Sequence, residues 1–426
     1  MNKFIVLGVF FTLWLENVLD IGFSLVPGLS DKNIVLYLAV TWIILQAVLD
    51  GRQGGFMHRR HEYLPLHLAY IGLISLAAVS ASICVFLIRY PGYTPVYAVV
   101  SLKGSLIDHY LMLFVFLAGV RTGTEALQIA RVILVAMGIA AIVWLADAFG
   151  LADLGIVDHE DRIITPMGEA NQTGTIMGFY VPLMFACGLV TRGFARAFWF
   201  AGATVCLLML LVTASRGAMA GLLGAAILAA WFFRDRIRAE YIAPAVVALL
   251  VLGAASFLLL PEEYRALLSA RLYDTGAQSS IYGQSSGRTG IWTYGLAQMA
   301  AAPLTMLVGF GWKTFSLMNP NASHNDYLEL FFNLGVVGLL LAMIVYFSVV
   351  QHVRRALEIA DPEARVILIA FLLGYASILI AIFFVNLHAP WYFVWSFTGL
   401  MLRLASDPVL AQREVPRGSM SAQLPT

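Results

Sequence analysis

Three basic side chains, far apart along the chain, suit chemistry on a phosphate ester. Arg216 lies in the short segment 213–217 between two apolar stretches, Arg288 begins an amphipathic helix, and His324 lies where another apolar stretch begins. The planar fork of arginine matches phosphate oxygens, and a neutral imidazole can take a proton from an attacking hydroxyl. Together these residue types indicate transfer of a group away from an anionic leaving group.

The residues around His324 predict the start of a helix. Ser323, with Asp326 three positions later, fits a capping box in which aspartate replaces glutamate. His324 would then lie in the first turn, where the positive end of the helix dipole favours neutral imidazole. A plain cap with an interfacial histidine would leave the same pattern, and Arg216 would equally suit contact with lipid phosphates.

Composition sets the fold class that must hold these residues. The chain has 426 residues, of which 60% are hydrophobic and 12% charged, and its mean hydropathy is +0.83. Many windows exceed the roughly 18 apolar residues that span a bilayer, so we expect an all-α polytopic membrane protein with about twelve transmembrane helices. The expected spans are 4–27, 33–50, 64–88, 105–120, 126–149, 171–191, 196–213, 217–233, 241–260, 325–350, 364–385 and 390–404. Segment 89–104, with its prolines, is interpreted as a re-entrant or surface helix.

Charge orients these spans. If the N-terminus is cytoplasmic, the larger share of the 26 lysines and arginines falls on the cytoplasmic side, so both termini are expected there. The chain then divides into spans one to nine (1–260), a periplasmic loop (261–323), spans ten to twelve (324–405) and a cytoplasmic tail (406–426). The three cysteines lie in apolar segments and indicate no disulfide or zinc site.

The periplasmic loop is expected to form surface helices. A short helix from Pro261 to Arg271 is followed by a flexible piece, 276–287, and an amphipathic helix from Arg288 to about Ala302. Segment 307–312 would turn back to the membrane. The loop is too apolar to be a free domain, so we expect a lid on the bilayer surface.

Three helix starts on the outer side would converge on an anion site. Spans six, eight and ten begin near Gly168–Gly174, Arg216 and His324, and helix N-termini favour negative charge.

Two acidic residues on span one, Glu16 and Asp20, either bind a sugar, pair with a basic residue or reach the interface.

Four sequence blocks in a fixed order carry a resemblance to a known family. They are Gly168-Glu-Ala-Asn-Gln, Ser215-Arg-Gly, Gly287-Arg-x-x-Ile-Trp292 with Gly309-Phe-Gly311, and Ser323-His-Asn-x-Tyr-Leu328. The chain resembles the O-antigen ligase and polymerase family of bacterial membrane glycosyltransferases, best over 165–345. The resemblance implies a GT-C-like fold, pyrophosphate binding by Arg216 and Arg288, and catalysis by His324. Further substrate contacts are expected from Asn171, Arg265, Trp292, Lys313, Asn325 and Tyr327.

The expected activity is that of an O-antigen ligase in the bacterial inner membrane, with its active site facing the periplasm. It would transfer polysaccharide from undecaprenyl pyrophosphate to a sugar hydroxyl of lipid A-core. Membrane lipids would surround the protein, and no nucleic acid is expected as a partner. The outer side holds no Asp-x-Asp, and the chain holds no phosphate loop, so we expect neither metal nor cofactor. Alternatives are an O-antigen polymerase, a protein O-oligosaccharyltransferase, and a transporter or flippase, although no inverted repeat is seen.

Overall fold

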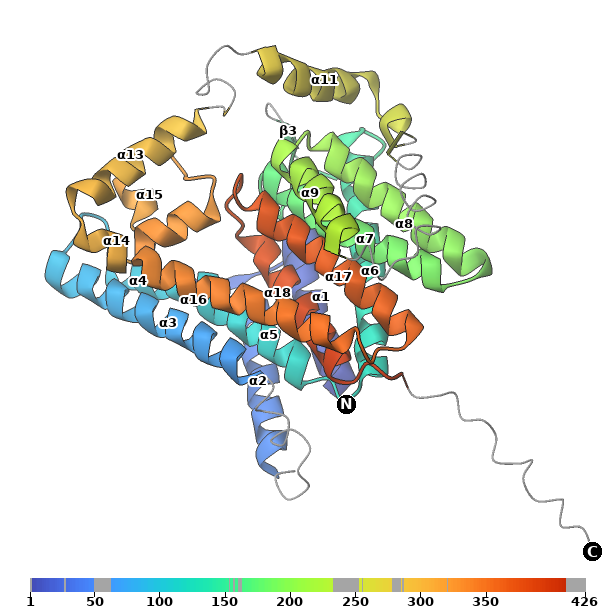
Figure 1. Ribbon diagram of the computed structural model, residues 1–426, viewed down its shortest axis with the longest axis horizontal. Coiled ribbons are helices and arrows are strands. Elements are labelled where there is room, and N and C mark those ends of the chain that lie inside the picture. The colour runs from blue at the N-terminus through green and yellow to red at the C-terminus, as the bar shows by residue number, and fades with distance from the viewer. Residues whose placement is uncertain are drawn as a thin grey trace, which may run out of the picture.

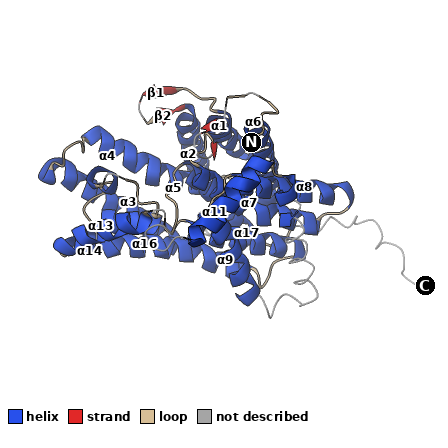
Figure 2. Cartoon of the chain, turned by 90° about the horizontal axis from the view of Figure 1, so that it is seen from above, coloured by secondary structure: helices blue, strands red, loops and turns tan. Residues whose placement is uncertain are grey.

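The protein is a bundle of helices that cross one another at various angles (Figure 1). The computed structural model describes residues 2–26, 28–49, 63–152, 154, 155, 158, 159, 163–232, 253, 254, 256–277, 285, 287–319 and 321–410. Its helices are α1 (Asn2–Leu19), α2 (Asp31–Leu49), α3 (Leu64–Ile83), η2 (Cys84–Ile88), α4 (Pro95–Leu102), η3 (Lys103–Ile107), α5 (Asp108–Ala118), α6 (Gly123–Ala148), α7 (Ala170–Val190), α8 (Gly193–Val212), α9 (Arg216–Phe232), α11 (Glu262–Ala277), α13 (Arg288–Ala301), α14 (Leu304–Val308), α15 (Phe315–Met318), α16 (Asp326–Ala356), α17 (Pro362–Ala381) and α18 (Ala389–Ser406). Two small antiparallel hairpins, β1 (Ser24–Val26) with β2 (Leu29–Ser30) and β3 (Asp158–His159) with β4 (Ile163–Ile164), complete it. Figure 2 shows how little of the chain they occupy.

The prediction of an all-α polytopic membrane protein is confirmed. Among the described residues, nine helices are long and apolar enough to cross a membrane, and the apolar part of α9 is a shorter one. α18 corresponds to the last expected span. Most of the expected span 241–260 lies outside the described residues, as does most of the tail 406–426. The count of twelve spans therefore stays a prediction.

The interpretation of 89–104 as a separate surface segment was wrong. One continuous helical stretch runs from Pro95 to Ala118, so the fourth span begins ten residues earlier than expected. Thr94 caps it by accepting a hydrogen bond from the amide of Tyr97. Pro95 occupies the first helical turn, where a missing amide hydrogen costs nothing. The proline that suggested a break is therefore the start of the helix.

Hydrogen bonds between helix ends agree with a chain that alternates across the membrane. At one end, Lys3 donates to Gln128 and the amide of Gly123 donates to Asp407. At the other end, the Tyr264 hydroxyl donates to the carbonyl of Ala148. Each bond joins ends that an alternating path puts on the same side. Which side is cytoplasmic stays a prediction, as does the position of 261–323 on the bilayer surface.

The acidic residues of the first span are held by local partners. Glu16 forms an ion pair with Lys32 at 2.6 Å and accepts a hydrogen bond from the Ser30 hydroxyl. Of the roles considered for Glu16, pairing with a basic residue is the one that the structure shows. Asp20 lies just beyond α1, with a left-handed backbone (φ 54°).

Two backbone segments cross at the break in α16 and fix the helices of the outer loop. Gly335 interrupts α16 with φ 64° and ψ −168°, and a Cβ there would lie 2.2 Å from the carbonyl carbon of Leu307. Across the crossing, the amides of Phe310 and Gly311 donate to the carbonyls of Phe332 and Asn333 at 2.8 and 2.9 Å. α13, α14 and α15 gather at this end of α16 (Figure 1). The sequence Gly309-Phe-Gly311 is thus a docking point for the loop on the membrane helix.

We expect Gly335→Ala to lower thermal stability in detergent strongly, because the new methyl group would meet the backbone of Leu307 in a conformation that is nearly restricted to glycine. Gly193→Ala is the matched control. Gly193 also has a positive φ of 60°, but nothing lies within 4 Å of its added Cβ, so the control carries only the strain of roughly 1–2 kcal/mol. Equal melting temperatures for the two variants would contradict the close crossing.

Candidate active site

A cavity of about 250 Å³ lies where the first residues of three helices meet. α7, α9 and α13 begin beside it, and α11 and the loop before α16 close it. Its lining residues are Glu169, Asn171, Arg216, Gly217, Arg271, Arg288 and His324. Arg216, Arg288 and His324, which are distant in sequence, thus face one space, as the expected convergence of helix starts requires. We call this space the arginine cavity.

The charge of the arginine cavity is strongly positive. Burial lowers the pKa of Arg288, the nearby Arg216 and Arg271 lower it further, and Glu169 opposes them. The guanidinium stays charged nevertheless, because arginine does not lose its proton in proteins. Three arginines therefore share the cavity with a single acidic lining residue, Glu169, within the described part of the chain. Such an arrangement favours a ligand that carries more than one negative charge.

A tight turn between α8 and α9 positions Arg216. Ala214 adopts a left-handed conformation (φ 46°), and Ser215 caps α9 through a contact of 3.4 Å with the amide of Ala218. The Ser215 hydroxyl also donates to the Asn171 side chain at 3.0 Å, which ties the starts of α7 and α9 together. A Cβ on Gly217 would lie 2.8 Å from the Cβ of Phe384. In Ser215-Arg-Gly217, the serine therefore caps and tethers, the arginine supplies a cation, and the glycine permits a close approach.

His324 lies in a loop that two distant segments hold. Its backbone is left-handed, with φ 49°. Before it, Ser323 is fully buried, its hydroxyl donates to the Asn386 side chain at 3.0 Å, and its carbonyl accepts from the Trp292 indole at 2.8 Å. After it, Asn325 caps α16 by accepting from the amide of Leu328. The side chain of His324 is thus presented by a firmly held loop to the arginine cavity.

The expected cap at Ser323 was therefore wrong, and so was the place of His324 in the first helical turn. Asn325 is the cap, one residue after His324, and the helix begins at Asp326. Ser323 is drawn away from the capping position by its bond to Asn386, which lies 63 residues further along the chain. His324 precedes the helix, and the left-handed backbone aims it independently of the helical turn.

Comparison with known families agrees with this arrangement. Residues 201–343 match the family model described as O-antigen ligase. The match covers less than half of the chain. The matched residues contain all four basic residues of the arginine cavity, whereas Glu169 and Asn171 precede the match. No curated protein matches the chain. Members of this family are glycosyltransferase-like enzymes that act on lipid-linked glycans.

Some of the expected substrate contacts have other partners in the structure. Trp292 binds the carbonyl of Ser323, Asn325 caps α16, and the Tyr327 hydroxyl donates to the carbonyl of Leu379 at 2.7 Å. These three side chains hold the loop and the start of α16, and they are absent from the lining of the arginine cavity. Arg265, on α11, is also absent from that lining, whereas Asn171 belongs to it.

Lys313 belongs to a second, larger cavity. It forms an ion pair with Glu329 at 2.6 Å. Burial lowers the pKa of Lys313, but the Glu329 carboxylate overcomes this and holds the pKa above its usual value. Lys313 therefore stays charged and partnered, in a space that shares no lining residue with the arginine cavity.

Sequence reasoning missed two lining residues and one polar cluster. Arg271 was predicted only as the end of a surface helix, and Glu169 only as part of a helix start and of a sequence block, without a role in the site. Their neighbours in sequence gave the available signal, because Glu169 lies within the block that contains Asn171. The cluster of Asp326, Glu329 and His388 had no such signal, since His388 belongs to no recognised block.

Proposed function

We propose that this protein is an O-antigen ligase, which transfers a polysaccharide from undecaprenyl pyrophosphate to a sugar hydroxyl of lipid A-core at the periplasmic face of the inner membrane. The observation that carries the proposal is the meeting of Arg216, Arg271 and Arg288 with His324 around one cavity. A pyrophosphate ester needs cations at the leaving group, and a sugar hydroxyl needs a base. The arginine cavity offers both within one space.

In the proposed reaction, an acceptor hydroxyl oxygen attacks the anomeric carbon of the first donor sugar. The new glycosidic C–O bond forms as the bond between the anomeric carbon and the phosphate oxygen breaks. The electron pair of the broken bond leaves with undecaprenyl pyrophosphate. A ring nitrogen of neutral His324 takes the hydroxyl proton and later releases it to water. No oxidant, reductant or nucleotide enters this balance.

The arginines stabilise the departing charge in this mechanism. As the bond to phosphate breaks, negative charge grows on the pyrophosphate, and fixed cations near it act most strongly in a site shielded from water. Arg216 stands at the first residue of α9, so its charge adds to the positive end of that helix. Arg288 begins α13 in the same way.

Reconstitution of the protein in liposomes tests which molecule accepts the glycan. Purified protein in liposomes is given undecaprenyl pyrophosphate carrying preformed O-antigen polysaccharide together with rough lipopolysaccharide. We expect long glycan to move to lipid A-core on a gel. If the protein instead lengthens the lipid-linked glycan and leaves lipid A-core bare, it is a polymerase with the same donor. Movement of the donor across the bilayer without any transfer would identify a flippase.

We expect the transfer to continue in excess chelator. In the proposed mechanism three guanidinium groups supply the positive charge at the leaving group, so a divalent cation has no required part. The measurement is the rate of transfer in EDTA against the rate in added magnesium or manganese. Loss of activity that added metal restores would overturn the assignment of this role to the arginines.

A further inference from the structure

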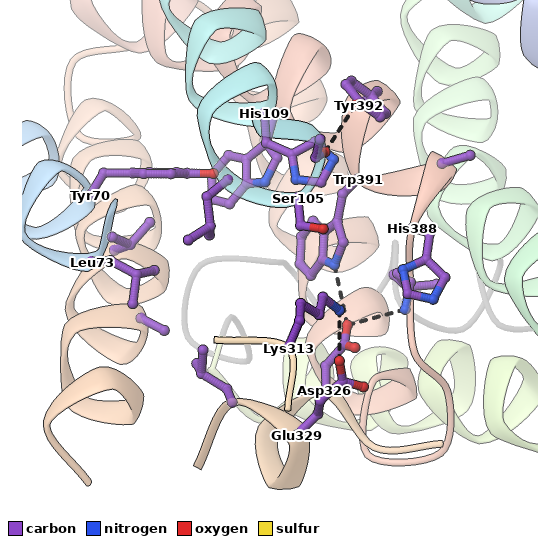
Figure 3. A pocket seen from close by; sticks show the side chains of 18 of the residues that line it. Tyr70, Leu73, Ser105, His109, Lys313, Asp326, Glu329, His388, Trp391 and Tyr392 are labelled. Atoms are coloured by element: carbon purple, nitrogen blue, oxygen red, sulfur yellow. Dashed lines mark hydrogen bonds and ion pairs between the residues drawn. The ribbon is translucent and has the colours of Figure 1, made fainter. Parts of the chain in front are cut away.

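A second cavity, of about 340 Å³, lies between α3, α5, α16 and α18, and the arginine cavity chemistry makes no use of it. Figure 3 shows its side chains: Lys313, Asp326 and Glu329 gather on one side, with His109, Trp391 and His388 around them. Its size falls in the range of small-ligand sites. We call it the aromatic cavity, because six tryptophan and tyrosine side chains line it: Tyr70, Trp312, Tyr346, Trp391, Tyr392 and Trp395.

The aromatic cavity adjoins the arginine cavity. His324 lines the arginine cavity, and Asp326, two residues later, lines the aromatic one. The pKa of His388 is lowered, first by burial and then by Lys313, and the carboxylates of Glu329 and Glu169 oppose this lowering. Glu169, which lines the arginine cavity, is therefore close enough to act on His388 in the aromatic cavity. The Ser323 hydroxyl, next to His324, also lies 3.2 Å from the Glu329 carboxylate. A ligand that enters both cavities would pass beside His324.

Both lysines that line the aromatic cavity are in ion pairs. Lys313 pairs with Glu329, and Lys32 pairs with Glu16. Asp326 accepts hydrogen bonds from the side chain of Asn386, the amide of Leu387 and the indole of Trp391, at 3.0 to 3.2 Å. An anionic ligand would therefore meet no unpaired cation among the described lining residues. The cavity favours a neutral, polar ligand.

Two buried nitrogen atoms of the lining have no hydrogen-bond partner within the described part of the protein. They are His109 Nε2 and Trp312 Nε1, and both residues are only 4% exposed. A buried polar group without a partner is costly to the fold, so its position is informative. Trp312 is not loosely held, because its amide donates to Ser80 and its carbonyl accepts from the Tyr93 hydroxyl. The buried indole N–H, on a backbone held in this way, is a donor available to a ligand.

Three of the aromatic rings lie nearly parallel to one another. Trp391 stacks on Trp395 with 5.6 Å between ring centroids, and Tyr346 stacks on Trp391 at 5.9 Å with an interplanar angle of 6°. Aromatic rings with polar tips suit ligands that combine apolar surface with hydrogen-bonding groups. A sugar ring has this character, since C–H groups cover its faces and hydroxyl groups surround its edge.

We propose that the aromatic cavity is a carbohydrate subsite that binds roughly one or two neutral sugar rings of a glycan beside His324. An aromatic ring of the lining covers a sugar ring face, and Trp312 Nε1 donates to a hydroxyl oxygen. His109 Nε2 and the carboxylate oxygens of Glu329 and Asp326 accept from sugar hydroxyl groups. The proposal rests on the proposed function only for the identity of the glycan. Binding of free sugar needs neither donor pyrophosphate nor transfer.

The test measures binding of two released glycans that lack pyrophosphate and lipid. One is core oligosaccharide cleaved from lipopolysaccharide by mild acid, and the other is the O-antigen repeat released from its carrier. Saturation-transfer NMR with the full-length protein in nanodiscs should detect saturable binding of at least one of them. Core binding would make this an acceptor subsite, and repeat binding a donor-sugar subsite. Binding of neither glycan would overturn the proposal.

Trp312→Phe is the main variant, because it keeps an aromatic ring and removes the N–H. We expect about 2–10-fold weaker binding of the glycan, as for one neutral hydrogen bond, without loss of thermal stability. A merely structural N–H would instead leave glycan affinity unchanged, which would contradict the proposal. Leu330→Trp, which fills the cavity from α16, should abolish binding and serves if Trp312→Phe does not fold.

Arg288→Lys separates this proposal from the function of the arginine cavity. Arg288 does not line the aromatic cavity, so free glycan should bind to this variant with unchanged affinity. If transfer proves absent in every assay while Trp312-dependent glycan binding remains, the proposed function fails and the subsite stands. If transfer proceeds but Trp312→Phe and Leu330→Trp bind glycan normally, the subsite fails and the proposed function stands.

Discussion

Replacing His324 by alanine is expected to slow glycan transfer by roughly 10²–10⁴-fold while donor affinity changes little. The reason is the role proposed for the imidazole, which acts on the acceptor hydroxyl and not on the pyrophosphate. The arginines remain in place in this variant, because Ser215 and Asn171 hold Arg216, and the start of α13 holds Arg288. Donor affinity and single-turnover rate must therefore be measured separately.

The left-handed backbone at His324 calls for a second variant. Alanine disfavours a φ of 49°, so loss of activity in His324→Ala has two sources, the missing base and a disturbed loop. Asparagine tolerates this conformation and cannot serve as a base near neutral pH. We expect His324→Asn to be slowed as strongly as His324→Ala, with a melting temperature near that of the wild type. Full transfer by His324→Asn would show that the position matters only for the backbone.

The membrane helices were predictable because the bilayer leaves a chain few choices. Apolar stretches of sufficient length must be helical, since backbone groups find no water there. The helix starts near Asn171 and Arg216 followed from alternation of the spans and from short polar turns, and the helix that Arg288 begins was expected in the outer loop. The structure then shows that these starts share one cavity. These starts can meet only if they lie on the same side of the membrane, and the number of spans between them, which the sequence predicts, decides that side.

Contacts across long separations were not predictable in this way. Ser323 has the sequence of a cap, but its hydroxyl bonds to Asn386, and Asn325 takes the capping position. Lys313 looked like an outer basic residue free for substrate, but it pairs with Glu329. In both cases a local pattern competes with a partner brought near by folding, and the partner determines the outcome. Sequence spacing contains no information about that partner.

The break in α16 at Gly335 is a second feature that sequence spacing alone does not predict. Glycine within an apolar stretch is common, and the sequence indicated only that the membrane helix continues past it. The need for glycine comes from Leu307, whose backbone would lie 2.2 Å from an added Cβ. Such a close approach joins two segments that are distant in sequence, so only the assembled chain reveals it.

Replacing Arg216 or Arg288 by lysine is expected to weaken donor binding by about 10–100-fold, even though the charge is kept. A hydrogen bond to a charged group contributes about 1.5–3 kcal/mol, and lysine loses the paired donors that match two phosphate oxygens. Both residues line the arginine cavity, and Arg216 is anchored at the first residue of α9. The double variant should lose more than either single one.

Arg89→Lys is the matched control for these substitutions. Arg89 follows η2 on the side expected to face the periplasm, and it lines neither cavity, so its replacement should leave donor affinity unchanged. Affinity is measured with lipid-linked donor in nanodiscs, and the single-turnover rate is measured at saturating donor. If Arg216→Lys and Arg288→Lys bind donor normally while His324→Ala does not, the roles of arginine and histidine are reversed. If the arginine variants bind weakly but turn over at the wild-type rate once saturated, the arginines hold the donor without stabilising the departing charge, and the electrostatic part of the mechanism must lie with other groups.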